Sequence, residues 1–332
     1  MWWYWGKYEN RKKSNNIALI FILGLGEKMR KYVTLSFLFF VSICGAVSAD
    51  TAVTDGADVP TLAPRGCCPC CAMRCCCVSS EFGKPDSKWK LVWGDEFNDE
   101  GLPDVAKWGY AVGGHGWGNN ELQYYTDARI ENAEVHDGVL RIRAIKEPFG
   151  GKDYTSARLI SRGKGDFFYG RLEVRARLPE GRGTWPAIWM MPADWWFGSN
   201  GVWPDIGEID IMEHVGYEPG VIHASAHSKD YQWRKGTQKT GIINVPDAMD
   251  TFHTYAFEWD HEVMRAYVDE QLYFEYYNEG LGVDKWPYDK AFYLILNIAV
   301  GGDWGGVEGV DESVFPQSME VDFVRYYSAV EE

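Results

Sequence analysis

From about Trp89 onward, apolar and polar residues alternate in short runs separated by Gly, Asn and Asp. The segment 171–178 shows this most clearly, because Leu172, Val174, Ala176 and Leu178 alternate with charged residues. A period of two residues is typical of a β-strand with one buried face. Comparable runs are found at 138–145, 254–259, 263–268, 272–277, 292–299 and 321–327. No long helical period accompanies them, so the pattern predicts an all-β fold, most simply a sandwich of two antiparallel sheets.

The first 49 residues have the pattern of an export signal. A charged start at Met29 is followed by an apolar run over 32–47 and by small residues up to Ala49, after which we expect cleavage. The short apolar run disfavours a membrane-spanning helix, and we expect no stable membrane partner. Residues 1–28 fit the pattern poorly, so translation starting at Met29 is the simpler interpretation. A long atypical signal or a membrane anchor is the alternative to a secreted or periplasmic protein.

Residues 50–86 are rich in Pro, Gly, Asp and Ser and hold the cysteines Cys67 to Cys77. The eighth cysteine, Cys44, lies in the apolar run, and none follows Cys77, so the rest of the chain folds without disulfides. The cluster is too crowded for simple pairing, and its spacing matches no zinc pattern well. We interpret 50–86 as a disordered linker and 87–330 as a single catalytic domain.

Charge and aromatic content narrow the class of partner. The net charge of −15 and the pI near 5.0 disfavour binding to nucleic acid, which is itself negatively charged. A hydrophobic fraction of 46% is enough for a sizeable core. The 16 Trp and 19 Tyr residues fill part of that core, and some suit stacking against sugar rings. We expect a monomer that acts on a polysaccharide.

Three carboxylates lie close together in the segment 203–214. Glu208 and Asp210 point to the same face of a strand, whereas Glu213 has the wrong parity. A β-bulge at Ile211-Met212 would restore the parity and align all three. Neighbouring carboxylates raise one another's pKa, which suits a general acid at neutral pH. The apolar spacers disfavour a solvated loop, but a calcium site or a solvated acidic strand remains an alternative to catalysis.

The segment 207–213, Gly-Glu-Ile-Asp-Ile-Met-Glu, resembles the Glu-x-Asp-x-x-Glu signature of family 16 glycoside hydrolases, in the bulged form of the laminarinase branch. Further similar segments are 93–97, 119–126, 156–160, 184–190, 296–302 and 321–327. The resemblance implies a curved jelly-roll sandwich with the active site on its concave face. It implies a retaining double displacement with Glu208 as nucleophile, Glu213 as acid/base and Asp210 tuning the nucleophile.

The same resemblance assigns residues around the carboxylates. The Gly-rich loop 113–121 would shape the side of the cleft that binds the non-reducing part of the substrate, with sugar hydroxyls held by Asn120 and Glu121. A network of turn residues is the alternative for this loop. Further substrate-binding residues are expected at Arg158, Trp185, Trp189, Trp203 and His227. His223 and His227 share a face and could bind a metal, but glycoside hydrolysis needs none, so no cofactor is expected for catalysis.

The resemblance also implies a structural calcium ion away from the catalytic residues. The matching ligands are Glu96, the carbonyl of Gly138 and Asp322, and oxygen-only ligands suit Ca²⁺. The alternative is that Glu96 and Asp322 are ordinary carboxylates at strand ends.

The predicted activity is endo-hydrolysis of β-1,3-glucan, extending to mixed-linkage β-1,3-1,4-glucan. A galactan hydrolase of the agarase or carrageenase type is an alternative. A sulfated substrate would want several cationic residues in the cleft, and only Arg158 and Arg182 lie near the motifs, which favours a neutral glucan. A non-catalytic glucan-binding lectin would not need both Glu208 and Glu213. A transglycosylase uses the same intermediate, so the sequence does not separate it from a hydrolase.

Overall fold

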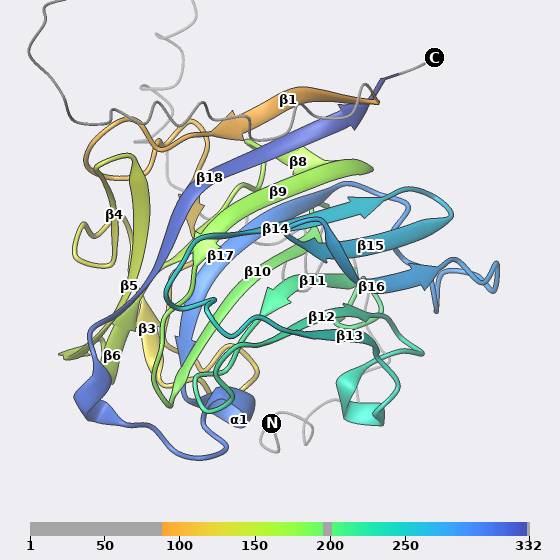
Figure 1. Cartoon of the computed structure of the whole chain (residues 1–332). Helices are drawn as coiled ribbons and strands as arrows, with labels where there is room; N and C mark the ends of the chain where they lie inside the picture. The colour runs from red at the N-terminus through yellow and green to blue at the C-terminus, as the bar shows by residue number, and fades with distance from the viewer. Residues whose placement is uncertain (1–87, 195–200, 331–332) are drawn as a thin grey trace, which may run out of the picture. The chain divides into compact units, whose positions relative to one another are not determined.

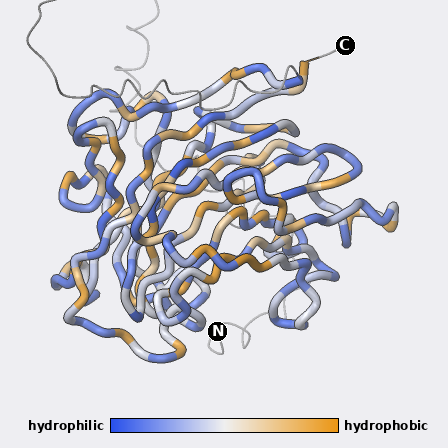
Figure 2. Tube along the Cα trace, in the orientation of Figure 1, coloured by the Kyte–Doolittle hydropathy of each residue, from blue (hydrophilic) through white to orange (hydrophobic). Residues whose placement is uncertain are grey.

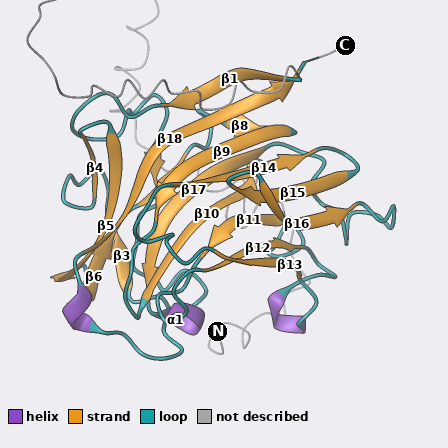
Figure 3. Cartoon of the chain, viewed as in Figure 1, coloured by secondary structure: helices purple, strands orange, loops and turns teal. Residues whose placement is uncertain are grey.

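The computed structural model describes residues 88–194 and 201–330. Strands dominate this part of the chain (Figure 3), and its helical segments are the short turns α1 (Gly302–Gly305), η1 (Trp233–Lys235) and η2 (Glu312–Val314). No helix among the described residues is long and apolar enough to cross a membrane. The all-β prediction is therefore confirmed. The predicted export signal, the cysteine-rich segment, Trp195 and Trp196 lie outside the described residues.

The strands form two sheets. The ten-stranded sheet, called the outer sheet below, follows the order β16-β15-β14-β9-β18-β5-β6-β3, with β1 paired to β18 and β4 to β5. Its strands are β1 (Trp89–Asp95), β3 (Gln123–Tyr125), β4 (Ala133–His136), β5 (Val139–Phe149), β6 (Lys152–Ser156), β9 (Gly170–Arg177), β14 (His253–Trp259), β15 (Val263–Val268), β16 (Gln271–Tyr277) and β18 (Gln317–Ala329).

The eight-stranded sheet, called the site sheet below, follows the order β13-β12-β11-β10-β17-β7-β2, with β8 paired to β17. Its strands are β2 (Gly109–Tyr110), β7 (Arg158–Ile160), β8 (Asp166–Phe167), β10 (Thr184–Pro192), β11 (Glu208–Glu213), β12 (Val221–His227), β13 (Lys239–Asn244) and β17 (Phe292–Val300). Neighbouring strands of this sheet pair antiparallel. Figure 1 shows the long curved strands of the two sheets lying one over the other.

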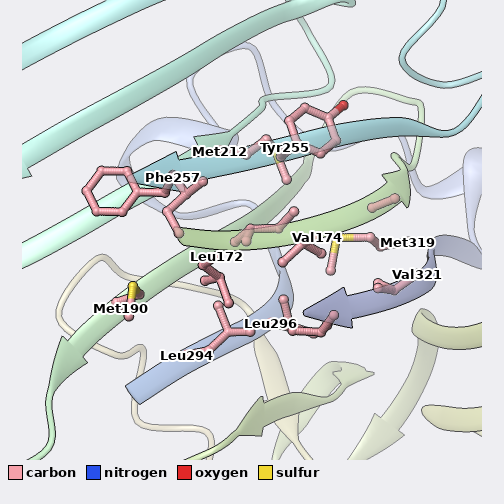
Figure 4. Packing of buried hydrophobic residues seen from close by; sticks show 14 of the residues in the cluster. Leu172, Val174, Met190, Met212, Tyr255, Phe257, Leu294, Leu296, Met319 and Val321 are labelled. Atoms are coloured by element: carbon pink, nitrogen blue, oxygen red, sulfur yellow. The ribbon is translucent and has the colours of Figure 1, made fainter. Parts of the chain in front are cut away.

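Alternating side chains build the core between the sheets. Figure 4 shows Leu172 of β9 and Phe257 of β14 facing Met190 of β10 and Leu294 of β17, and all four are fully buried. Burying each such side chain contributes roughly 1.5–3 kcal/mol. Apolar and polar residues accordingly alternate along the strands (Figure 2). The period of two that predicted the strands is thus the pattern of core contact.

The strand β17 departs from simple alternation, because all nine of its residues are buried. Leu294 and Leu296 face the core, whereas Tyr293 and Ile295 pack in a second cluster with Met191 on the opposite face of the site sheet. This opposite face, called the site face below, is therefore partly covered by its own side chains. It carries the residues described next.

Candidate active site

The three carboxylates predicted to act together lie on β11, a central strand of the site sheet. The register shifts within this strand, because Met212 pairs with Ile188 of β10 while Asp210 pairs with the next residue, Trp189. Ile211 is therefore the extra residue of a β-bulge. Both Ile211 and Met212 are buried in the core. The structure thus contains the bulge that the spacing of the carboxylates required.

The bulge returns Glu213 to the site face. On β12, Glu208 lies opposite His227 and Glu213 lies opposite His223, two residues that are four apart and so share a face. Asp210 is buried between the two glutamates, with 3% of its surface exposed. All three carboxylates therefore line one surface.

Each glutamate accepts a hydrogen bond from a tryptophan. The indole Nε1 of Trp203 donates to Glu208 over 2.9 Å, and that of Trp185 donates to Glu213 over 3.1 Å. An N–H donor stabilises the ionised form of a carboxyl and fixes its direction. Trp185 and Trp203 were predicted to bind sugar, and the structure shows that they also orient the two glutamates.

Burial and mutual repulsion raise the pKa of the carboxyls. Burial and the charge of Asp210 raise the pKa of Glu208 to about 7, opposed by His227 and by the Trp203 hydrogen bond. Burial raises the pKa of Asp210 to about 8. Burial and the Asp210 charge also hold the pKa of Glu213 well above its usual value. The site therefore retains protons near neutral pH, as general acid catalysis requires.

His227 lies beside the central carboxylate. Its Nε2 is 3.1 Å from Asp210 Oδ2, and both side chains are almost fully buried. A nearby imidazole stabilises the ionised form of the carboxyls whenever it carries a proton. The prediction that His227 neighbours the catalytic face agrees with this position. Glu208, Asp210 and His227 could together hold a metal ion, with their ligand atoms within 4.8 Å of one another.

Trp189 lies on the site face four residues after Trp185, on the same strand. The strand β10 runs without interruption through Pro186 and Ala187, which lie between the two. Two residues four apart on a strand share a face, so both partly exposed indoles line the site. The Nε1 of Trp189 donates to the side chain of Asn297 over 2.7 Å, which fixes the direction of its ring.

A buried polar network continues from Asn297. Its amide donates to the hydroxyl of Tyr125 over 3.0 Å, and this hydroxyl in turn donates to Glu121 over 3.4 Å. Gln123 also donates to Glu121 over 2.5 Å. Sequence reasoning did not identify Asn297, although a single amide within the apolar run of β17 was a usable signal. Glu121 was predicted to bind sugar hydroxyls, but the structure shows its carboxylate bonded within the protein.

Asn120 of the Gly-rich loop and Arg158 of β7 were also predicted to bind sugar. Asn120 is exposed, has a positive φ of 55° and donates to Asp303 over 2.7 Å. Arg158 lies between two indoles, with its guanidinium carbon 4.5 Å from the ring centres of both Trp117 and Trp189. Its buried Nε has no hydrogen-bond partner. Arg158 therefore lies on the site face between two indoles, whereas the side chain of Asn120 is held by Asp303 of α1.

Two further side chains that sequence reasoning missed border the site. Trp304 of α1 contacts the ring of Trp185 edge-on at 5.5 Å and that of His223 at 5.0 Å. At the Glu208 end, the guanidinium of Arg234 lies 4.9 Å from the ring centre of Trp203. One face of Trp203 is therefore covered by the protein.

The predicted calcium ligands lie where β1 and β5 approach β18. Asp322 of β18 is the extra residue of a bulge in the pairing with β9. Its carboxylate pairs with Arg175, and the carboxylate of Glu96 accepts hydrogen bonds of 2.7 and 2.8 Å from Arg325. Both carboxylates are thus neutralised by arginine. An ion held by Glu96, Asp322 and the carbonyl of Gly138 would have to compete with Arg325 and Arg175 for these carboxylates.

Two glutamates on one face of a β-sandwich, with raised pKa values and aromatic rings on either side, form the arrangement of a glycoside hydrolase. Either glutamate can attack or donate a proton. The aromatic rings offer flat apolar surfaces to a sugar.

Comparison with known proteins gives the family. Residues 117–324 match the model of glycosyl hydrolases family 16. The chain is similar to a β-glucanase of Rhodothermus marinus, with 55% identity over 77% of this chain and 91% of the relative. It is 39% identical to a glucan endo-1,3-β-glucosidase of Cryptopygus antarcticus, over 72% of this chain and 92% of that protein.

The fold is similar to a solved structure. The X-ray structure of the Rhodothermus marinus laminarinase matches with a TM-score of 0.71 and 57% identity, over 73% of this chain and 98% of the other. The chain belongs to glycoside hydrolase family 16, and its fold is the jelly-roll sandwich of that family.

Proposed function

We propose that this protein is a retaining endo-β-glucanase that hydrolyses β-1,3-glucan of the laminarin type and also accepts mixed-linkage β-1,3-1,4-glucan. The observation that carries the proposal is the bulged strand β11, which turns Glu208 and Glu213 to one face. There each glutamate accepts a hydrogen bond from the indole N–H of a tryptophan. The substrate class is supported by the names of the similar proteins, a β-glucanase, a glucan endo-1,3-β-glucosidase and a laminarinase.

The mechanism follows from the two carboxyl groups. Glu208, ionised, attacks the anomeric carbon, while Glu213, protonated, gives its proton to the leaving glycosidic oxygen. Water then enters, Glu213 removes its proton, and the bond between Glu208 and the sugar breaks with net retention of configuration. Because Trp203 donates to Glu208, its N–H stabilises the carboxylate both before attack and on release.

The cationic side chains found near β11 fit a neutral substrate better than a sulfated one. Arg158 is stacked between Trp117 and Trp189, where its guanidinium can donate hydrogen bonds to sugar hydroxyls. A sulfated galactan needs several cationic groups in the cleft, and among the described residues near β11 we find Arg158 and Arg234. Reducing-sugar release from laminarin, lichenan, agarose and carrageenan tests the choice. We expect laminarin to be cleaved fastest, and preferential cleavage of agarose or carrageenan would contradict the proposal.

The same reaction products separate hydrolase from transglycosylase and lectin. A hydrolase yields oligosaccharides shorter than the starting glucan, whereas a transglycosylase also yields longer ones. A lectin binds laminarin without releasing reducing ends. Because Glu208 and Glu213 are both present and both oriented by tryptophan, we propose a catalyst and not a lectin. Shorter products without longer ones would then identify a hydrolase.

We further propose that the protein is exported, acts as a monomer and binds a structural calcium ion. Export is supported by the charged, apolar and small residues of 29–49, and mass spectrometry of secreted protein should find a chain beginning at Asp50. Light scattering tests the monomer. Calcium binding at Glu96, Gly138 and Asp322 should raise the Tm on addition of the ion and lower it on chelation.

A further inference from the structure

Two β-bulges lie on opposite sides of the core. In β11 of the site sheet the extra residue is Ile211, between Asp210 and Met212. In β16 of the outer sheet, Phe274 pairs with Ala266 and Leu272 pairs with the next residue of β15, which makes Tyr273 the extra residue. A bulge re-aims side chains that a regular strand would turn the other way.

The bulge in β16 sends Tyr273 inward. Phe274 and Tyr276, two residues apart, are buried with 3% and 5% of their surfaces exposed, so they mark the core face of this strand. In a regular strand Tyr273 would point away from the core. Instead its hydroxyl donates a hydrogen bond to the backbone carbonyl of Ile211. One bulge residue thus bonds the other across the sandwich.

The backbone of Tyr273 is held from the site sheet. Gly241 of β13 lies so close to β16 that a Cβ atom there would be 2.2 Å from the carbonyl oxygen of Tyr273 and 2.8 Å from the Cα of Phe274. Only glycine permits this approach. The two sheets therefore meet at Gly241. This contact holds the backbone of Tyr273 in place, and from there its phenol reaches the bulge of β11.

The phenol remains a proton donor throughout the working range of the enzyme. Burial holds the pKa of Tyr273 well above its usual value, and Tyr255 and Glu213 add to the effect. The extra residue of a bulge has no partner in the strand ladder, so a fixed donor at its carbonyl limits how the peptide between Ile211 and Met212 can rotate.

We propose that Tyr273 is a positioning residue for Glu213: by bonding the carbonyl of Ile211 it fixes the bulge, and thereby the direction from which Glu213 presents its proton. The inference rests on the proposed role of Glu213 as acid/base. Tyr273 touches no substrate and acts through the backbone of β11. Loss of the hydroxyl should therefore impair proton donation while leaving substrate binding and the attack by Glu208 intact.

Tyr273→Phe tests this, with Tyr276→Phe as the matched control. Tyr276 is on the same strand, and its hydroxyl also donates to a backbone carbonyl, that of Lys285, over 3.0 Å. We expect Tyr273→Phe to lower kcat on laminarin about 10- to 100-fold, the scale of a small misplacement of a catalytic group. KM should change less than about twofold, and the basic limb of the pH profile should shift.

A second substrate isolates the acid step. On a dinitrophenyl β-glucoside oligomer, whose leaving group needs no proton, the burst of dinitrophenol should be slowed less than about threefold in Tyr273→Phe. The ratio of this rate to the laminarin rate does not depend on the fraction of folded enzyme. Gly241→Ala, which displaces Tyr273 through its backbone, should change the ratio in the same direction in the fraction that folds.

A wild-type ratio in either folded variant, or the same change in Tyr276→Phe, would overturn the inference. Glu213→Ala in the same assay separates this outcome from failure of the proposed function. If Glu213→Ala favours the dinitrophenyl substrate and Tyr273→Phe does not, only the role of Tyr273 is wrong. If Glu213→Ala shows no such preference, the assignment of Glu213 itself is wrong.

Discussion

The carboxyl groups of this site are individually unfavourable for folding. Glu208, Asp210 and Glu213 share one partly covered surface, and burial raises the pKa of each. A carboxyl whose folded pKa is raised binds its proton more tightly in the folded than in the unfolded chain, so ionising it weakens folding. The ionised carboxyls that perform acid/base chemistry therefore lower the free energy of unfolding.

The first prediction concerns how ionisation of Glu208 changes the stability of the fold. Its pKa rises from 4.5 in the unfolded chain to about 7 in the fold, so its contribution to stability is present below pH 4.5 and is lost as pH rises through about 7. Glu208→Gln cannot ionise but still accepts the Trp203 N–H. We expect it to be more stable than wild type by about 3 kcal/mol at pH 8 and little changed at pH 4. Urea unfolding at both pH values measures this, and equal stability at pH 8 would contradict it.

The second prediction uses the two tryptophans as controls for each other. Trp203 lowers the pKa of Glu208, and Trp185 lowers that of Glu213. If Glu208 must be ionised and Glu213 protonated, Trp203→Phe should move the acidic limb of kcat/KM upward by roughly half to one pH unit. Trp185→Phe should move the basic limb upward by a similar amount. Shifts of the opposite limbs would mean that the two glutamates have each other's roles.

At the scale of elements, the strand β11 shows what could be predicted from sequence. Parity alone required an extra residue between Asp210 and Glu213, and the structure has it at Ile211. The second bulge, at Tyr273, could not be predicted, because Leu272, Tyr273 and Phe274 are all apolar and their pattern does not show which of them is the extra residue. The bulge lies against Gly241 of the other sheet, and a contact between segments far apart leaves no local pattern.

The third prediction tests the parity of β11. Deleting Ile211 gives a regular strand in which both glutamates still share the site face, so measurable activity on laminarin should remain. Deleting both Ile211 and Met212 makes Glu213 the neighbour of Asp210, so the two side chains point to opposite faces of the strand. The kcat of this variant should fall by more than about a thousandfold, the scale of losing a general acid. An active double deletion together with an inactive single deletion would show that parity is not what places Glu213.

At the scale of the whole molecule, the order of the strands in the sheets was not readable from their alternation. Strands far apart in sequence, such as β9 and β18, pair because the jelly-roll brings them together, and only the family resemblance supplied that topology. Buried links such as Asn297 to Tyr125 depend on the same long-range pairing. Local pattern therefore predicted strands and carboxylates, whereas the supporting network needed the fold.

The fourth prediction concerns the extent of the folding unit. The strands of both sheets and the buried residues of the core all lie within the described ranges 88–194 and 201–330. A chain beginning at Ser87 should unfold cooperatively and match the kcat/KM of a chain beginning at Asp50. Thermal unfolding and laminarin hydrolysis measure both. Loss of cooperative unfolding in the shorter chain would show that the segment 50–86 is structural.

The central claim is that Glu208 is the nucleophile and Glu213 the acid/base, and azide tests it most directly. Glu213→Ala with a dinitrophenyl β-glucoside oligomer still forms the intermediate on Glu208, and azide then attacks without needing a general base. NMR of the product should show a β-glucosyl azide. Glu208→Ala has no nucleophile, so azide attacks directly and can give only the inverted α-glucosyl azide. A β-azide from Glu208→Ala, with no rescue of Glu213→Ala, would contradict the account and reverse the two roles.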